Sequence, residues 1–189
     1  MYFCEIRLDL FVTKNKSQLM SFFNFCPNCS SKNFKFENNR RFECSDCKMV
    51  YFHNVAAAVA IIIERGDEIL FTVRNNEPQK GKLDFPGGFT DPNETAEETC
   101  SREIKEELNI DISPSDFKYF CSQPNDYNYR NIPYKTEDLI FIAHFPKNAE
   151  IILEKSEIAD YQWIKKQEID LDEIGFLSLR KAMKAYLKK

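Results

Sequence analysis

The sequence predicts an α/β protein in which a mixed β-sheet lies between helices and a small four-cysteine module comes first. Two observations lead to this prediction. Short apolar segments with strand character alternate along the chain with two amphipathic helical segments, the order expected of a sheet covered by helices. Two Cys-x-x-Cys pairs stand together before the first of these segments. With 189 residues, the chain is long enough for one ordinary core and one small module.

The four-cysteine module occupies residues 24–52 and is predicted to bind zinc. Its two Cys-x-x-Cys pairs, separated by 14 residues, can each place two thiolates on one tight turn, and together they complete a tetrahedral site. So short a segment cannot bury a core, and the metal would supply the folding energy. Residues 32–42 are predicted to form a short hairpin, as in a zinc ribbon. The predicted ligands are Cys26, Cys29, Cys44 and Cys47.

Redox or disulfide use is the alternative for these cysteines. A thioredoxin-like Cys-x-x-Cys motif needs a βαβ context, which this part of the sequence lacks. The chain has seven cysteines, and an odd number argues against a secreted disulfide framework. A reducing cytoplasm is therefore the expected location.

Six segments are predicted as strands of the main domain, residues 53–189. The first is a continuous apolar run, β-branched toward its end, which predicts a buried strand. A turn at Gly66 pairs it with the second, and a long aromatic loop over 123–136 joins the fourth to the fifth. A capping-box pattern at Thr95 predicts the start of one helix, and residues 175–187 form an amphipathic second helix. The predicted strands are 55–64, 68–74, 83–88, 117–122, 139–145 and 161–164, the third of which is short and runs into a glycine turn.

The most informative segment for function is the acidic helix that follows Gly87-Gly88. Glu103, Glu106 and Glu107 are spaced i, i+3 and i+4, so all three carboxylates lie on one helix face. Like charges one turn apart repel, which calls for a counter-charge. Arg102 can supply part of it, and a hard divalent cation with oxygen ligands can supply the rest.

The spacing of this segment resembles the Nudix box. Gly88 is followed by five residues, Glu94, seven residues and then Arg102-Glu103-Ile104-Lys105-Glu106-Glu107-Leu108-Asn109-Ile110. Every fixed position of the box matches except the last glycine, which is Asn109 here. That glycine would end the helix in the left-handed region, where Asn is the next most tolerated residue. The resemblance implies an α/β/α sandwich that hydrolyses a nucleoside diphosphate linked to another moiety.

The Nudix resemblance also implies roles for the residues of the box. Glu106 and Glu107 should be ligands of Mg²⁺ or Mn²⁺, and Glu103 should be a ligand, the general base, or both. Arg102 should orient Glu103 through a charge-assisted hydrogen bond. Glu94 should have a structural role rather than bind metal. An acidic helix face exposed to solvent is the alternative for the whole set.

Two further parts of a metal site are expected outside the acidic helix. A backbone carbonyl at Gly87 or Gly88 would complete the ligand shell. Nudix enzymes often add a carboxylate from beyond the box, and the acidic stretch before Trp163 resembles the segment that carries it. Glu157 is the first candidate and Asp160 the second, and the alternative is that both are ordinary surface acids.

A four-cysteine ribbon followed directly by a Nudix domain resembles the NADH pyrophosphatase and ADP-ribose pyrophosphatase group. In that group Ser-Gln-Pro is followed by Trp-Pro-Phe-Pro, whereas here Gln123 lies in Ser-Gln-Pro but Asn-Asp-Tyr-Asn-Tyr follows. Tyr127, Tyr129 and Tyr134 are candidates to stack on a base or ring, or else to pack the loop. The resemblance implies NAD(H) or ADP-ribose as substrate and AMP as a product.

Composition narrows the function classes further. The formal net charge of −4 predicts no binding to nucleic acid, and no apolar run is long enough to span a membrane. Residues 1–23 form an N-terminal extension whose alternation of apolar and charged residues predicts a half-buried strand. A homodimer is compatible with the sequence. The functional alternative to an enzyme is a nucleotide-sensing module whose ribbon docks a partner.

Overall fold

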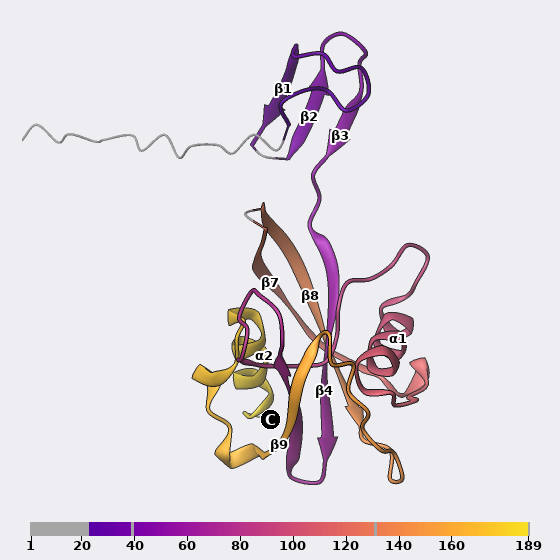
Figure 1. Cartoon of the computed structure of the whole chain (residues 1–189), viewed down its shortest axis with the longest axis vertical. Helices are drawn as coiled ribbons and strands as arrows, with labels where there is room; N and C mark the ends of the chain where they lie inside the picture. The colour runs from indigo at the N-terminus through magenta and orange to yellow at the C-terminus, as the bar shows by residue number, and fades with distance from the viewer. Residues whose placement is uncertain (1–22, 39, 131, 189) are drawn as a thin grey trace, which may run out of the picture. The chain divides into compact units, whose positions relative to one another are not determined.

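The computed structural model describes residues 23–38, 40–130 and 132–188 (Figure 1). The chain divides into two compact units, Met1–Asn54 and Val55–Lys189. The strand predicted within residues 1–23 lies outside the described residues. No helix in the described part of the chain is both long enough and apolar enough to cross a membrane.

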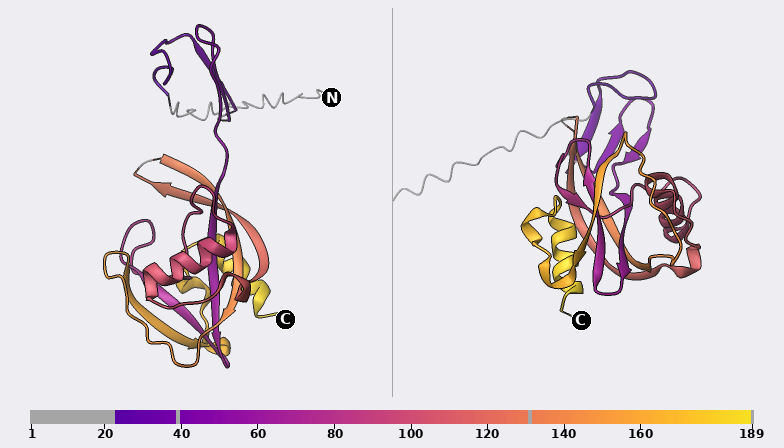
Figure 2. Two further views of the ribbon diagram at one scale, coloured as in Figure 1. Left: turned by 90° about the vertical axis from the view of Figure 1, so that its right-hand side faces the viewer. Right: turned by 60° about the horizontal axis from the view of Figure 1, so that its bottom comes forward.

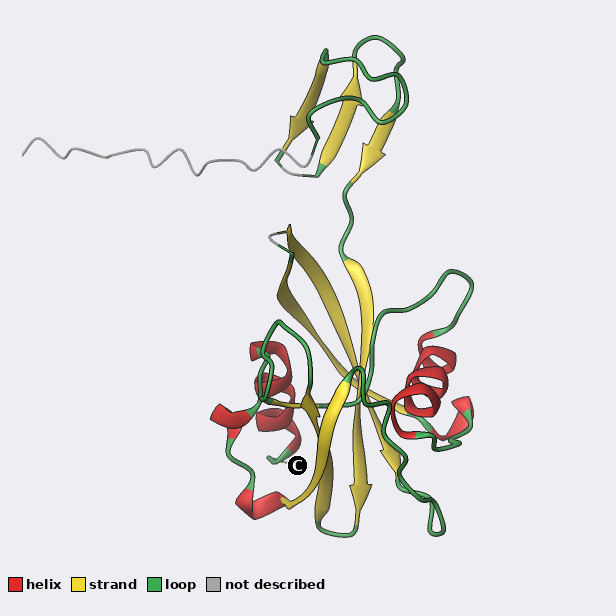
Figure 3. Ribbon diagram, in the orientation of Figure 1, coloured by secondary structure: helices red, strands yellow, loops and turns green. Residues whose placement is uncertain are grey.

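The first unit is a three-stranded antiparallel sheet with β2 in the centre (Figure 3). The predicted hairpin is present as β1 and β2, and a third strand pairs with it. Phe42 is fully buried and packs with Cys26 and Cys44, and the rings of Phe23 and Phe34 lie 4.9 Å from its ring. This core therefore consists of the cysteine cluster and a group of aromatic rings. The strands are β1 Phe34–Glu37, β2 Arg41–Cys44 and β3 Val50–Phe52.

The second unit is built on a six-stranded mixed sheet, which confirms the predicted fold class. The strand order is β6-β5-β4-β8-β7, and β9 pairs with β5. β4 runs parallel to β8, and the other pairs are antiparallel. The strands are β4 Ala56–Arg65, β5 Glu68–Arg74, β6 Leu83–Asp84, β7 Lys118–Tyr129, β8 Ile132–His144 and β9 Ile158–Lys165.

Two helices cover opposite faces of this sheet, as Figures 1 and 2 show. Helix α1, Ala96–Leu108, packs on Ile61 and Ile63 of β4, whereas helix α2, Leu177–Tyr186, packs on Ile62. Successive side chains of a strand point to opposite faces, so a strand covered on both sides must be apolar at every position. The continuous apolar run of β4 therefore reflects two buried faces. Three short 3₁₀ segments complete the unit, namely Pro114–Asp116, Lys166–Glu168 and Leu171–Glu173.

The prediction of a long aromatic loop over residues 123–136 is wrong. These residues extend β7 and β8 into a continuous antiparallel hairpin, with Tyr127 opposite Tyr134 and Tyr129 opposite Ile132. The sequence obscured the strand because Asn, Asp and Pro have low strand propensity. Pairing with β8, whose parallel partner is β4, overrides that propensity.

Candidate active site

Helix α1 begins and ends as its sequence predicts. The Thr95 hydroxyl accepts a hydrogen bond from the Glu98 amide at 3.2 Å, and the Glu98 carboxylate accepts one from the Thr95 amide at 2.8 Å. Asn109 at the C-terminal end adopts the left-handed conformation, with φ 56° and ψ 32°. Asn therefore replaces the glycine of the box without disturbing the cap. Cys100, Ile104 and Leu108 pack in the core with β4 and so set which face of the helix carries the glutamates.

Arg102 organises the acidic face with all five of its N–H groups. Its Nε donates to Glu94, one terminal nitrogen donates to Glu103 at 2.7 Å and to Glu106 at 3.0 Å, and the other donates to Glu94 and to the Phe89 carbonyl. The bonds from Arg102 lower the pKa of Glu94 to about 2. The predicted contact between Arg102 and Glu103 is present, and Glu94 anchors the arginine.

Glu103 and Glu107 are buried carboxylates, whereas the Glu106 side chain is exposed. Glu103 and Glu107 retain 8% and 7% of their accessible surface. Burial raises the pKa of both carboxyl groups, and the nearby charge of Glu157 raises both pKa values further. Arg102 opposes the shift at Glu103, while Glu107 has the Gly87 amide as a donor at 3.0 Å. The like charges of these buried carboxylates therefore repel one another, and a bound cation would relieve that repulsion.

The turn at Gly87 and Gly88 is packed so closely that neither position has room for a side chain. Gly87 has φ 146°, and a Cβ there would lie 2.2 Å from the Val59 carbonyl oxygen. A Cβ on Gly88 would lie 2.4 Å from a carboxylate oxygen of Glu103. Glycine thus lets the backbone lie against β4 on one side and the acids on the other. The Gly88 carbonyl accepts from the Val59 amide at 2.8 Å.

The acidic face offers the donor type that Mg²⁺ and Mn²⁺ prefer, namely carboxylate oxygens beside a backbone turn. Its oxygens do not converge as tightly as the cysteine thiols do. Within the described ranges, the four cysteines are the one set of three or more candidate side chains whose ligand atoms all lie within 4.8 Å of one another. The assignment of Gly87, Gly88, Glu103, Glu106 and Glu107 to a metal stays a prediction.

Of the two candidate carboxylates beyond the box, only Glu157 lines the same cleft. It is the last residue of the turn that precedes β9, and its carbonyl accepts a hydrogen bond from the Asn75 amide at 2.9 Å. Its charge contributes to the raised pKa of Glu103 and of Glu107. Asp160 is exposed on β9 and does not border the cleft. The geometry therefore favours Glu157 over Asp160.

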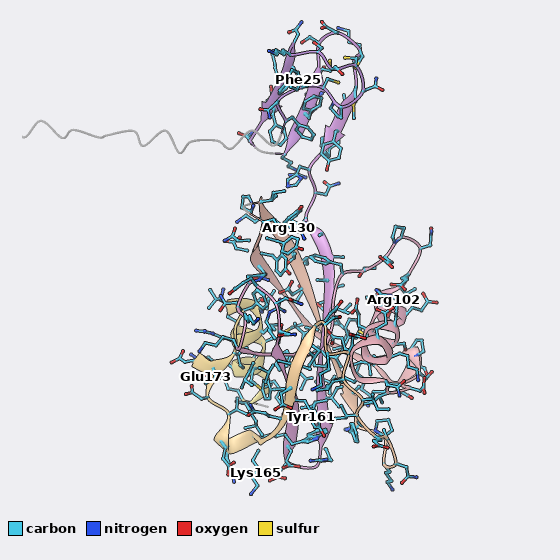
Figure 4. The ribbon with its side chains drawn as sticks, in the orientation of Figure 1. Phe25, Arg102, Arg130, Tyr161, Lys165 and Glu173 are labelled. Carbon is cyan, nitrogen blue, oxygen red and sulfur yellow. The ribbon has the colours of Figure 1, made fainter. Side chains whose placement is uncertain are left out.

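The cleft has a volume of about 850 Å³, and its other wall is aromatic. Tyr127 lies at the centre of this wall, with ring centroids 5.8 Å from Phe176, 6.3 Å from Tyr129 and 5.7 Å from Phe89. Tyr127 and Tyr129 are two residues apart on β7 and so lie on the same face of the strand. Gln123 and Tyr134 do not line the cleft. Figure 4 shows Arg130 at the end of the same hairpin.

Sequence reasoning missed several polar residues of the cleft. Arg74 at the end of β5 pairs with Asp84 of β6 at 2.6 Å. Asp138 of β8 is buried, and it accepts hydrogen bonds from Thr136 and Ser178, each at 2.6 Å. The available signal was an acid inside or beside an apolar strand, because a buried carboxylate needs a partner. Ser178 lies 40 positions from Asp138, and the pairing of Arg74 with Asp84 depends on β5 lying beside β6, so these partners cannot be identified from the sequence.

The four cysteines of the first unit form a compact cluster. Sγ of Cys26 lies 3.6 Å from Sγ of Cys47, and Sγ of Cys29 lies 3.6 Å from Sγ of Cys44. All four are free thiols. A tetrahedral zinc site with Zn–S bonds of about 2.3 Å requires sulfur–sulfur distances of about 3.8 Å. The two distances are close to that value, and all four sulfur atoms lie within 4.8 Å of one another.

Comparison with known proteins agrees with this geometry. Residues 53–186 match the family described as NUDIX domain. The chain belongs to the Nudix family. It is 31% identical over 167 residues to "Nudix hydrolase 19, chloroplastic" of Arabidopsis thaliana, and the match covers 85% of this chain and 37% of that protein.

Bacterial Nudix relatives are also similar. The "NAD-capped RNA hydrolase NudC" of Vibrio atlanticus is 27% identical, and the match covers 74% of this chain and 48% of that protein. The chain thus spans about half the length, or less, of these curated relatives.

Solved structures share the Nudix fold. A NUDIX hydrolase from Nitrosomonas europaea superposes with a TM-score of 0.61 at 22% identity, covering 88% of this chain and 91% of that one. A bifunctional NMN adenylyltransferase/ADP ribose pyrophosphatase from Francisella tularensis, solved with AMP and a manganese ion, has a TM-score of 0.56 at 24% identity. The match covers 72% of this chain and 42% of that one.

Proposed function

We propose that this protein is a metal-dependent pyrophosphohydrolase that cleaves the diphosphate of a nucleoside diphosphate linked to a second moiety. One observation carries the proposal. The buried carboxylates of Glu103 and Glu107 line the same cleft as the aromatic wall around Tyr127 and Phe176. The acids suit a metal-assisted attack on phosphorus, and the rings suit a flat base or nicotinamide.

The residues of the acidic face have separate roles in the proposed hydrolysis. When bound, Mg²⁺ or Mn²⁺ would neutralise charge on the diphosphate and make a water more acidic. Glu103, Glu106, Glu107 and Glu157 would hold the cation with a carbonyl of the Gly87–Gly88 turn. A raised pKa makes a buried glutamate a better proton acceptor, and Arg102 keeps Glu103 in one orientation.

The substrate we propose is NAD(H) or ADP-ribose, with AMP as one product. Its support comes from the order of ribbon and Nudix domain, from Ser-Gln-Pro at residues 122–124, and from the names of relatives that act on NAD-capped RNA or ADP ribose. We further propose one structural zinc held by the four cysteines, a cytoplasmic location and a possible homodimer.

A substrate panel tests the proposed reaction. NADH, NAD, ADP-ribose, diadenosine polyphosphates, nucleotide sugars and nucleoside triphosphates are incubated with Mg²⁺ or Mn²⁺, and products are separated chromatographically. We expect the highest kcat/KM for NAD(H) or ADP-ribose, with AMP released. A preference for nucleoside triphosphates would overturn the substrate while leaving the Nudix chemistry intact. Tight binding without turnover of any compound would instead favour the nucleotide-sensing module.

A further inference from the structure

The cleft is strongly acidic, and a diphosphate substrate has a second phosphate beyond the one that the metal of the acidic face would bind. Eight carboxyl side chains line it, against three arginines and no lysine among the described residues. A diphosphate entering this field is repelled unless cations compensate its charge at both phosphates. The acidic face provides one such position through its metal. The cationic side chains that line the cleft, and so can serve the second phosphate, are those of Arg74, Arg102 and Arg130.

Arg102 cannot serve the substrate, because each of its five N–H groups already donates to the protein. Turning it toward a phosphate would also release Glu94, Glu103 and Glu106 from their only shared cation. Arg130 is exposed at the end of the hairpin, with its guanidinium 5.1 Å from the Tyr129 ring. Its charge is therefore exposed to solvent, which screens it from a phosphate more than a half-buried guanidinium would be.

Arg74 has the position and the free donors that a phosphate needs. Its Nε donates to the Pro78 carbonyl at 2.7 Å, and one terminal nitrogen donates to Asp84 at 2.6 Å. The guanidinium carbon lies 5.0 Å from the centroid of Phe176, and Tyr127 is a further hydrogen-bonding neighbour. The bonds to Pro78 and Asp84 and the contact with Tyr127 use at most three of the five N–H groups of Arg74, so donors remain for a ligand in the cleft that Arg74 lines.

Arg74 also lies between the two walls of the cleft. Asp84, its partner, stands three residues before Gly87, and the charge of Asp84 acts on the buried Glu107. On its other side, Arg74 touches the ring of Phe176, which packs against Tyr127. A substrate that has one end at the acids and a base at the tyrosines must pass this guanidinium.

We propose that Arg74 binds the phosphate of the substrate that lies away from the metal, and that Asp84 and Phe176 hold the guanidinium in place for it. The proposal rests on the proposed function and assigns the phosphate specificity of that site. Arg74 is then the residue that distinguishes a nucleoside diphosphate from a monophosphate. A planar guanidinium can donate two parallel hydrogen bonds to a phosphate, which an ammonium group cannot.

Direct binding of two stable ligands tests this assignment. The ligands are AMP and adenosine 5′-(α,β-methylene)diphosphate, whose bridging carbon resists hydrolysis, and affinities are measured by calorimetry with Mg²⁺ present. In the unaltered protein the diphosphate analogue should bind at least about tenfold more tightly than AMP, since a charge-assisted pair is lost with AMP. In Arg74→Lys this ratio should fall to within about threefold, with AMP affinity nearly unchanged.

Two further variants separate the proposed role from a loss of folding. Removing Arg74 alone would leave the buried Asp84 carboxylate without its cation, so Arg74→Met is combined with Asp84→Asn. In this double variant the two ligands should also bind with nearly equal affinity. Arg65 is a matched control, because it pairs with Glu68 at 2.9 Å and covers the Trp163 ring at 3.8 Å, yet does not line the cleft. Arg65→Lys should keep the full ratio.

The outcomes distinguish the two proposals. A ratio in the Arg74 variants equal to that of the unaltered protein overturns the role of Arg74, and so does an unaltered protein that binds both ligands equally. Neither result affects the hydrolase proposal, which depends on turnover of the substrate panel. Loss of the ratio in Arg65→Lys as well would show a non-specific effect and would equally count against Arg74.

Discussion

Replacing Glu107 by Gln should raise the stability of the metal-free protein while abolishing most turnover. Glu107 keeps 7% of its surface, and its neighbours at the bottom of the cleft include the like charges of Glu103, Asp84 and Glu157. A glutamine retains the shape and can still accept the hydrogen bond from the Gly87 amide. It removes a buried charge that has no cationic partner of its own.

The size of the effect follows from this burial. Relieving one buried, repelled carboxylate should contribute about 1–3 kcal/mol, because such a group otherwise binds a proton or stays charged at a cost. For a domain of this size, that corresponds to a rise in Tm of about 3–10 °C. Turnover should fall by roughly 10²-fold or more, because the variant loses a ligand of the metal that would activate the attacking water.

The pH dependence of the effect has a definite sign. Burial raises the pKa of Glu107 in the folded state above its ordinary value of 4.5. The folded state then binds more protons than the unfolded state, so stability falls as pH rises from about 4.5 through the folded pKa. The advantage of Glu107→Gln should therefore be small at pH 4 and reach its full size at alkaline pH.

Thermal unfolding in EDTA between pH 4 and 9, followed by titration with Mg²⁺, measures these effects. Added Mg²⁺ should raise the Tm of the unaltered protein and have a smaller effect on the variant. Glu97→Gln is the control, since Glu97 lies in the first turn of the same helix and does not line the cleft. A lower Tm for Glu107→Gln in EDTA, together with near-normal turnover at saturating Mg²⁺, would refute the reasoning.

Three other predictions concern separate parts of the chain. Protein purified without added metal should contain one zinc per chain, and a content below ~0.2 with none regained on refolding would contradict the ribbon site; Cys26→Ser should destabilise the ribbon and leave Mg²⁺ binding intact. Tyr127→Ala should raise KM for the dinucleotide roughly three- to tenfold without changing metal binding, since one stacking contact is worth about 0.5–1.5 kcal/mol. The pKa of Glu94 is lowered to about 2, so its stabilising effect should be lost as pH falls from 4.5 toward 2. Glu94→Gln should flatten that part of the acid unfolding profile.

The parts of the fold that the sequence predicted are those set by local rules. The capping box at Thr95 and the left-handed Asn109 depend on residues a few positions apart, and both are present in the structure. The buried strand β4 was predictable because two covered faces impose an uninterrupted apolar run. The extended hairpin was not, because Asn125, Asp126 and Pro124 favour turns and only pairing with β8 makes them a strand.

In the candidate site, too, residues placed by local sequence were predictable and residues placed by long-range pairing were not. Glu103, Glu106 and Glu107 come from one helix, so their spacing alone places them on one face. The pairs Arg74–Asp84 and Asp138–Ser178 join different elements, and the second spans 40 positions of the sequence. Their meeting depends on the sheet order, which places β5 beside β6 and β8 within reach of α2. Contacts of this kind are predicted only after the topology is known.

Because the tyrosines lie on the paired strands of a hairpin and not in the predicted loop, the aromatic wall should bind a ligand differently. In a loop, tyrosines would have to be ordered by the substrate, and that ordering would reduce the affinity they provide. Tyr127 and Tyr129 instead lie on a strand paired with β8, and Tyr127 is held between Phe89 and Phe176 before any ligand arrives. The wall is therefore preorganised for a planar group. The acids lie on helix α1 and the tyrosines on β7, and both sets line one cleft. The cleft therefore favours substrates that carry a ring beyond the diphosphate.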